Sequence, residues 1–118
     1  MRFMLLVIPK GYEKAAPGTM PDAKIVGKMA KFNQELTKAG VLLGLDGLQP
    51  PSMGVRVTFS GGKAKVTDGP FSESKEVVGG YLIVSAASLD EATTMSKGCP
   101  ILEEGGSVEV RQIHPMQM

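Results

Sequence analysis

Three short segments of the chain are apolar at nearly every position, and they limit the folds that it can adopt. Residues 3–8, 41–45 and 81–84 read FMLLVI, VLLGL and YLIV. A strand with one face in water usually alternates apolar and polar residues, whereas a strand that is apolar throughout is buried on both faces. The chain therefore requires a sheet that is covered on one side by helices and on the other side by something else.

The region between residues 21 and 39 has the period of a helix. Its apolar residues recur at steps of four, three and four residues, which places them on one stripe: Ile25, Met29, Phe32 and Leu36. We predict that Thr19 caps this helix, with Pro21 and Asp22 in or near its first turn. Gly40 should end it in the left-handed conformation.

A second helix is predicted after residue 88. Ser88-Leu89-Asp90-Glu91 is a capping box, in which the Ser88 hydroxyl accepts the Glu91 amide and the glutamate reaches back. The apolar residues that follow have near-helical spacing: Leu89, Ala92, Met95 and Cys99. The helix should end near Gly98-Cys99-Pro100, and the alternating segment 107–111 should form the last strand.

Two alternating segments, residues 55–59 and 64–67, predict a β-hairpin. Ser60-Gly61-Gly62-Lys63 lies between them, and its two glycines can take the positive φ that a two-residue turn needs. The predicted register places the apolar pairs on the inner side of the hairpin: Phe59 with Ala64, and Val57 with Val66.

The resulting order is β-α-β-(β-β)-β-α-β, which is typical of an α+β fold. We expect one domain over residues 1–118, a ferredoxin-like βαββαβ protomer with an inserted hairpin, an antiparallel sheet and two helices on one face. Leaving the second sheet face in water would forgo about 1.5–3 kcal/mol for each large apolar side chain. We therefore expect a homodimer in which the same face of a second copy covers it.

Composition excludes several classes of partner. The chain is 42% hydrophobic and 21% charged with a net charge of +1 and no basic block, so neither a nucleic-acid nor a membrane partner is expected. The apolar run 3–8 is too short to span a bilayer. One cysteine excludes an internal disulfide and indicates a reducing compartment, so we expect a cytoplasmic protein. One histidine and one cysteine cannot form a zinc site, and Gly61-Gly62 opens no helix, so no metal or cofactor is expected.

Residues 66–81 concentrate polar side chains and backbone turns more than any other stretch. Asp68 either caps its own turn or acts as a base or ligand group. The charged residues Glu73, Lys75 and Glu76 either line a cleft, where the lysine would lower the carboxylate pKa values, or form exposed ion pairs. Tyr81 is a proton donor or a hydrogen-bonded core aromatic.

Two further features of the chain have structural interpretations. Gly79-Gly80 predicts a bulge or a close approach of two backbone segments. Cys99 has apolar neighbours at a helix end, which favours a buried, inert thiol over a nucleophile.

The stretch from Asp68 to Glu76, DGPFSESKE, resembles the signature of the YCII-related domain family in its DGPF subgroup. The similarity extends over nearly the whole chain, at residues 40–43, 47–51, 79–81, 90–92, 99–100 and 106–111. It implies a dimeric α+β barrel of ferredoxin-like protomers, a cleft in each protomer and a largely unassigned biochemical role. The broader group is similar to small degradative enzymes in which a histidine–aspartate pair is the proposed active site, but the sole histidine here, His114, lies in the tail 114–118. A histidine-dependent mechanism is therefore not expected.

We accordingly predict a small-molecule-binding protein or a small metabolic enzyme with a polar cleft at the signature. The candidate catalytic residues are Asp68, Lys75 and Glu76. The candidate ligand-binding residues are Pro70, Phe71, Glu73 and Tyr81. The alternative is a non-catalytic dimerising module that serves a regulatory partner, because relatives of this kind are often linked to sigma factors. The sequence alone leaves open whether the protein is an enzyme.

Overall fold

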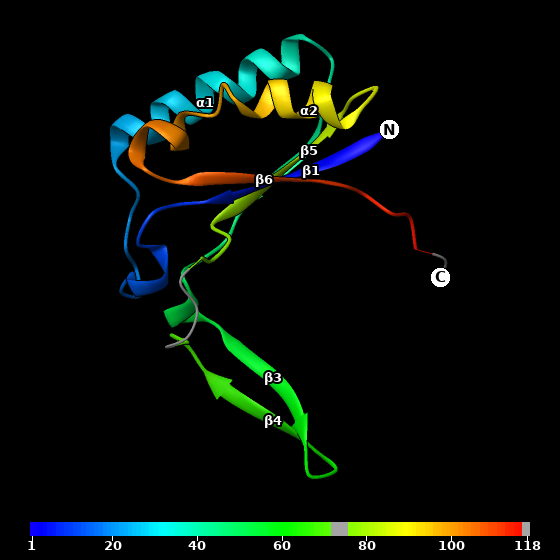
Figure 1. Cartoon of the computed structure of the whole chain (residues 1–118). Helices are drawn as coiled ribbons and strands as arrows, with labels where there is room; N and C mark the ends of the chain where they lie inside the picture. Colours follow the sequence, from blue (N-terminus) through cyan, green and yellow to red (C-terminus); the bar gives the residue numbers. More distant parts are fainter. Residues whose placement is uncertain (72–75, 117–118) are drawn as a thin grey trace.

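A computed structural model describes residues 1–71 and 76–116, and its centre is a four-stranded antiparallel sheet (Figure 1). The strands of this sheet are β1 (Arg2–Ile8), β2 (Leu42–Gly47), β5 (Gly80–Ser85) and β6 (Ser107–Gln112). The strand order is β2-β5-β1-β6, so the two strands at the centre are β5 and β1. This order and direction are those of the ferredoxin-like fold, as predicted.

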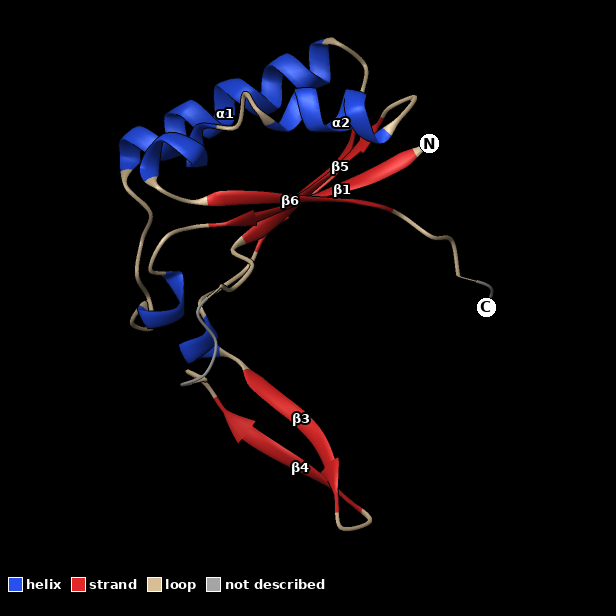
Figure 2. Ribbon diagram, in the orientation of Figure 1, coloured by secondary structure: helices blue, strands red, loops and turns tan. Residues whose placement is uncertain are grey.

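Two helices, α1 (Ala23–Lys38) and α2 (Leu89–Ser96), lie together on one face of the sheet (Figure 2). Short 3₁₀ turns occupy three of the connections: η1 (Tyr12–Lys14), η2 (Pro51–Met53) and η3 (Pro100–Glu104). Among the described residues, neither α1 nor α2 is long and apolar enough to cross a membrane.

Helix α1 begins later than predicted. Its N-cap is Asp22, whose Oδ1 accepts a hydrogen bond of 2.8 Å from the Lys24 amide, so the prediction of Thr19 as the cap was wrong. A residue that precedes proline is disfavoured in helical conformation, so Pro21 keeps the chain before it extended. The C-terminal end agrees with the prediction, since Gly40 follows the helix with a φ of 75°.

Helix α2 begins at the predicted capping box. The Glu91 amide donates to Ser88 Oγ at 3.2 Å, while the Glu91 carboxylate accepts from the Ala87 amide instead of that of Ser88. Ala92 is fully buried, but Leu89 remains 53% exposed. A step of three residues turns a helix about 60° short of a full circle, so Leu89 falls at the edge of the apolar stripe.

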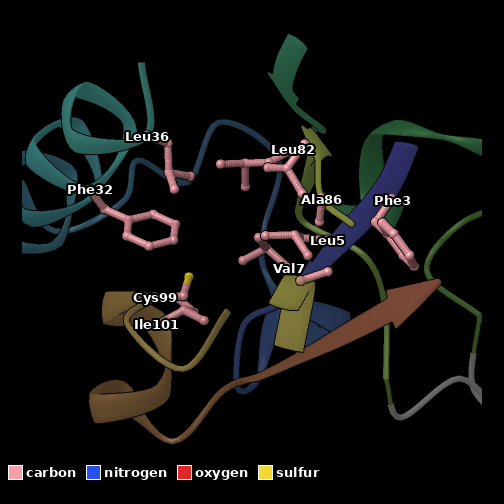
Figure 3. Close-up of a cluster of buried hydrophobic side chains, with 11 residues drawn as sticks. Phe3, Leu5, Val7, Phe32, Leu36, Leu82, Ala86, Cys99 and Ile101 are labelled. Atoms are coloured by element: carbon pink, nitrogen blue, oxygen red, sulfur yellow. The ribbon is translucent and has the colours of Figure 1, made fainter. Parts of the chain in front are cut away.

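The core lies between the sheet and the helices (Figure 3). Alternate residues of β1 and β5 enter it, because successive side chains of a strand point to opposite faces. The buried residues from all elements are Phe3, Leu5, Val7, Phe32, Leu36, Leu82, Val84, Ala86, Ala92, Cys99 and Ile101. Cys99 is the buried thiol that was predicted: it lies 3.8 Å from Met29 Sδ, and desolvation by burial raises its pKa.

The other sheet face is also apolar along its two central strands. Met4, Leu6 and Ile8 of β1 alternate with the buried residues, and the β1–β5 register pairs Met4 with Ile83 and Leu6 with Tyr81. Neither α1 nor α2 lies on this side (Figure 2). We call it the uncovered face. It presents the problem expected from the sequence, namely a second apolar surface without a layer over it.

Strand β2 departs from the prediction of a strand buried on both faces. Its register with β5 shifts between Leu42 and Gly44, so Leu43 lies in a bulge and is mostly exposed. Leu45 is 43% exposed even though it pairs with buried Leu82. The reason is that β2 is an edge strand, so a neighbouring strand shields its side chains on only one side.

The inserted hairpin has the predicted register but not the predicted environment. Strands β3 (Val55–Ser60) and β4 (Lys63–Asp68) pair Val57 with Val66 and Phe59 with Ala64 around Gly61 and Gly62, both at positive φ. The apolar pairs were expected to face inward, and this was wrong, because every residue of both strands is exposed. We call residues 55–68 the arm.

The base of the hairpin explains its direction. Pro50 is buried, and Pro50-Pro51 with the short turn η2 ends pairing at β2 and turns the chain away from the sheet. The Gly69 amide donates to Gly54 O at 2.9 Å and closes the base. The arm therefore projects from the domain on the side of the sheet opposite to the helices (Figure 1).

Candidate functional site

A cleft of about 390 Å³ lies between α1, the end of β2 and the start of β5. We call it the α1 cleft. Its walls are mainly apolar side chains from five separate segments, including Val7, Ile25, Met29, Leu45, Leu82 and Ile101. Ile25 and Met29 belong to the apolar stripe of α1, so the helical period that forms the core also forms one wall.

Two glycines build the wall where β5 begins. The Gly79 amide donates to Val7 O at 2.7 Å, and Gly79 O accepts from the Leu48 amide at 2.8 Å, so one residue links two neighbouring segments. A Cβ on Gly79 would lie 2.7 Å from Pro9 Cγ, and a Cβ on Gly80 would lie 2.9 Å from the backbone of Asp46. The close backbone approach predicted for this glycine pair is therefore present.

A second hollow of about 670 Å³ adjoins the α1 cleft near the start of α1. The two share Pro9, Ile25, Gly79 and Ile101 among their lining residues. The Tyr12 hydroxyl donates to Leu48 O at 2.5 Å and so ties the first loop of the chain to the segment after β2. Partial burial raises the pKa of Tyr12, which keeps this phenol protonated as a donor.

One polar group of the α1 cleft has no partner. Asn33 lies on α1 four residues after Met29 and lines the cleft. Its Oδ1 is buried and has no hydrogen-bond partner among the described residues. Buried side-chain oxygens are nearly always paired with protein or with ordered water, so this acceptor is open to a donor from water or from a ligand.

Asp46 and Tyr81 form a hydrogen-bonded pair at the edge of the sheet. The Tyr81 hydroxyl donates to Asp46 Oδ2 at 3.0 Å, across the register of β2 and β5. This hydrogen bond, together with the negative charge of Asp46, raises the pKa of Tyr81. Both residues border the α1 cleft, but strand alternation directs their side chains to the uncovered face, away from Leu82.

The described signature residues gather at the base of the arm and not in the α1 cleft. Asp68 is exposed at the end of β4, and a Cβ on Gly69 would collide with the Pro51 carbonyl oxygen. The Phe71 ring lies beneath the Arg56 guanidinium, 4.1 Å from the carbon to the ring centroid. This cation–π contact attaches the chain after β4 to the arm.

The remaining predicted site residues are dispersed. Pro70 and Glu76 are exposed. Glu73 and Lys75 lie outside the described residues. Tyr81 borders the α1 cleft and is separated from Asp68 by the connection between the arm and β5.

Sequence reasoning missed two residues that border the cleft, Asn33 and Asp46. Both left a signal in the sequence. Ile25, Met29 and Asn33 are spaced four residues apart, and Asn33 is the polar member of this row. Asp46 is the first charged residue after an apolar strand. Such interruptions of an apolar pattern are where a site can be sought.

The comparisons with known proteins agree with this fold. The model of the YCII-related domain matches residues 1–117. An uncharacterized protein of Rhizobium meliloti (strain 1021) is 30% identical to the chain over 93 residues, which cover 78% of this chain and 75% of that protein. Neither match assigns a biochemical activity. The chain belongs to the YCII-related domain family.

Proposed function

We propose that the protein binds a compact, mainly apolar organic molecule in the α1 cleft, and that it does so as a homodimer. The observation that carries the proposal is the buried Asn33 Oδ1, which has no partner among the described residues and lies in an otherwise apolar cleft. The ligand would carry at least one hydrogen-bond donor, such as a hydroxyl or an amide, to satisfy this oxygen.

The size and the electrostatics of the cleft favour this class of ligand. Small-molecule sites usually measure about 300–1,000 Å³ and combine apolar walls with a few polar groups. Among the described lining residues, Asp46 and Tyr81 are the ionisable ones, and their side chains point to the uncovered face. A charged ligand would then be buried without a partner, which is costly, so a neutral molecule is favoured.

The proposal can be tested with three related probes: 4-ethylphenol, which has a donor, 4-ethylanisole, which keeps the oxygen without the donor, and ethylbenzene. NMR titration should show all three perturbing the methyl groups of Ile25, Met29 and Leu45. The phenol should bind about fivefold more tightly, as expected for one hydrogen bond of about 1 kcal/mol.

The matched variants are Asn33→Leu in the cleft and Gln34→Leu on the exposed side of α1. Asn33→Leu should abolish the preference for the phenol while leaving ethylbenzene binding intact, and Gln34→Leu should change neither. If the probes leave the cleft signals unmoved, or if Asn33→Leu weakens all three equally, the proposal is wrong.

The uncovered face supports the homodimer. Met4, Leu6, Ile8 and Ile83 form its apolar centre, and the polar residues Glu109 and Arg111 of β6 lie beside it. A second copy related by a two-fold axis presents the same surface and would complete a dimeric α+β barrel. Light scattering at micromolar concentration should give twice the chain mass, and a monomer there would contradict the proposal.

The proposal also covers the subgroup of the family, the cellular location and the roles of the signature residues. Asp68-Gly69-Pro70-Phe71 and Gly79-Gly80-Tyr81 support membership of the DGPF subgroup. The single buried Cys99 fits a reducing cytoplasm. The acid–base roles of Asp68, Lys75 and Glu76 remain predictions.

A second candidate function is a non-catalytic dimerising module that serves a transcription partner. The observation that favours it is the arm, which exposes apolar side chains to solvent. Binding of the phenol probe at Asn33 would favour the first function. Probes that leave the cleft unmoved in a stable dimer would favour the second.

A further inference from the structure

The arm is amphipathic in a regular way. The β3–β4 register places five apolar residues on one of its faces: Val55, Val57, Phe59, Ala64 and Val66. Its other face carries polar residues: Arg56, Thr58, Lys65 and Thr67. The apolar side chains are nonetheless exposed to solvent, with Phe59 76% exposed and Val57 63% exposed.

Such an arm is not expected to remain in solvent. An isolated two-stranded hairpin is marginally stable in water at best, because it has no apolar layer to pack on. The four most exposed apolar residues of the arm present an area on the order of 400 Å², as large as the largest apolar patch of a typical monomer. The alternation of the arm therefore indicates a face that is buried in the assembled protein.

The arm and the uncovered sheet face open onto the same space. Figure 2 shows the helices on one side of the sheet and the arm extending from the other side. A second copy that covers the sheet face lies in the region into which the arm projects. We propose that each arm packs its apolar face against the partner copy, so that the arm and the uncovered face form one continuous interface.

The area of the arm supports a second copy as the occupant. A stable interface buries about 800 Å² on each partner, so the arm alone supplies about half. The apolar centre of the uncovered face supplies further area on the same side of the molecule. In a dimer with two-fold symmetry both arms are buried, because each arm packs against the other copy in the same way. Lys63, Lys65 and Arg56 on the polar side would then limit further strand addition.

This inference rests on the proposed homodimer, and its test is chosen to separate the two. The chain has no tryptophan, so Phe59→Trp introduces a single indole reporter on the apolar face. Thr58→Trp places the same reporter on the polar face as a matched control. Light scattering and tryptophan emission are measured together over a dilution series.

We expect the emission of Phe59→Trp to be blue-shifted in the dimer and to shift to the red as dilution dissociates it. Thr58→Trp should emit as a solvent-exposed indole throughout. If the dimer persists while Phe59→Trp emits like Thr58→Trp, the arm inference is overturned and the homodimer stands. A monomer at every concentration overturns both, and a blue shift that is independent of dissociation shows the arm folding onto its own protomer and also overturns the inference.

A second measurement does not depend on the reporter. Val57→Thr combined with Phe59→Thr should raise the dimer dissociation constant at least about tenfold, because apolar area is lost from both arms. Thr58→Ser combined with Lys65→Gln, the same number of changes on the polar face, should leave it within about twofold. Equal dissociation constants for the two double variants would contradict the inference.

Discussion

Gly79→Ala tests how tightly the start of β5 is held, since the added methyl group has no space. Its Cβ would lie 2.7 Å from Cγ and 2.8 Å from Cδ of Pro9, and 3.4 Å from Cδ2 of Tyr12. Real Cβ contacts are longer, and a proline ring cannot rotate away. Overpacking of this kind costs about 1–3 kcal/mol. Alanine also lowers the conformational entropy of the unfolded chain, which offsets about 0.4–1 kcal/mol of this destabilisation.

The expected net loss is therefore about 1–2 kcal/mol of unfolding free energy, and a loss of 1 kcal/mol lowers the Tm of a domain of this size by about 4 °C. The two hydrogen bonds of Gly79, to Val7 and from Leu48, would also lengthen as the segments separate. Urea unfolding followed by circular dichroism, at one fixed protein concentration, measures the change.

Gly27→Ala provides the control. Gly27 lies within α1, and a Cβ there meets nothing within 4 Å. The same substitution should therefore stabilise the protein by about 0.5–1 kcal/mol, because glycine is a poor helix former. Opposite signs at the two sites are the expected result. A Gly79→Ala variant as stable as Gly27→Ala would show that Pro9 does not confine this residue and would refute the reasoning.

Three further predictions concern the Tyr81–Asp46 hydrogen bond, the Asp68 carboxylate and the C-terminal tail. The hydrogen bond to Asp46 raises the Tyr81 pKa above 10.0, so this bond stabilises the fold below pH 10.0 and is lost as pH rises through the folded-state pKa. Ultraviolet titration in a Tyr12→Phe background should show the raised Tyr81 pKa, and Asp46→Asn should lower that pKa. Asp68→Asn should cost at most about 1 kcal/mol of stability while abolishing binding or turnover at the signature if Asp68 acts there, and early melting with normal binding would favour the turn role. Deletion of residues 114–118 should leave the unfolding free energy unchanged, and a loss above about 2 kcal/mol would show a docked tail.

The parts of the fold that were predictable depend on local rules. The register of the arm follows from Gly61-Gly62, because a two-residue turn fixes which residues face each other. The cap of α2 follows from four consecutive residues beginning at Ser88. The exposure of the arm did not follow from these rules, because its direction is set at its base by Pro50-Pro51 and by the Gly69–Gly54 hydrogen bond.

The candidate site was less predictable than the fold. The signature drew attention to the stretch around Asp68, whose charges and turns are concentrated in the sequence. The α1 cleft depends instead on residues with ordinary local patterns, such as Ile25, Leu45 and Ile101, which meet only in three dimensions. The close approach at Gly79-Gly80 could be predicted because glycine pairs at strand starts have few other uses.

The dispersed origin of the α1 cleft would tie binding of the proposed ligand to cooperative folding. Its walls come from β1, α1, β2, β5 and η3, which are elements spread along nearly the whole chain. A partly folded chain that lacks any one of them has no complete cavity, so a ligand selects the fully native state. The stabilisation by a ligand then grows with the logarithm of its concentration above its Kd, and reaches about 2.7 kcal/mol at one hundred times Kd. Protection of amide hydrogens in β6, which supplies none of the described lining residues, should rise with that in the walls, which makes hydrogen exchange at Val110 a reporter of occupancy.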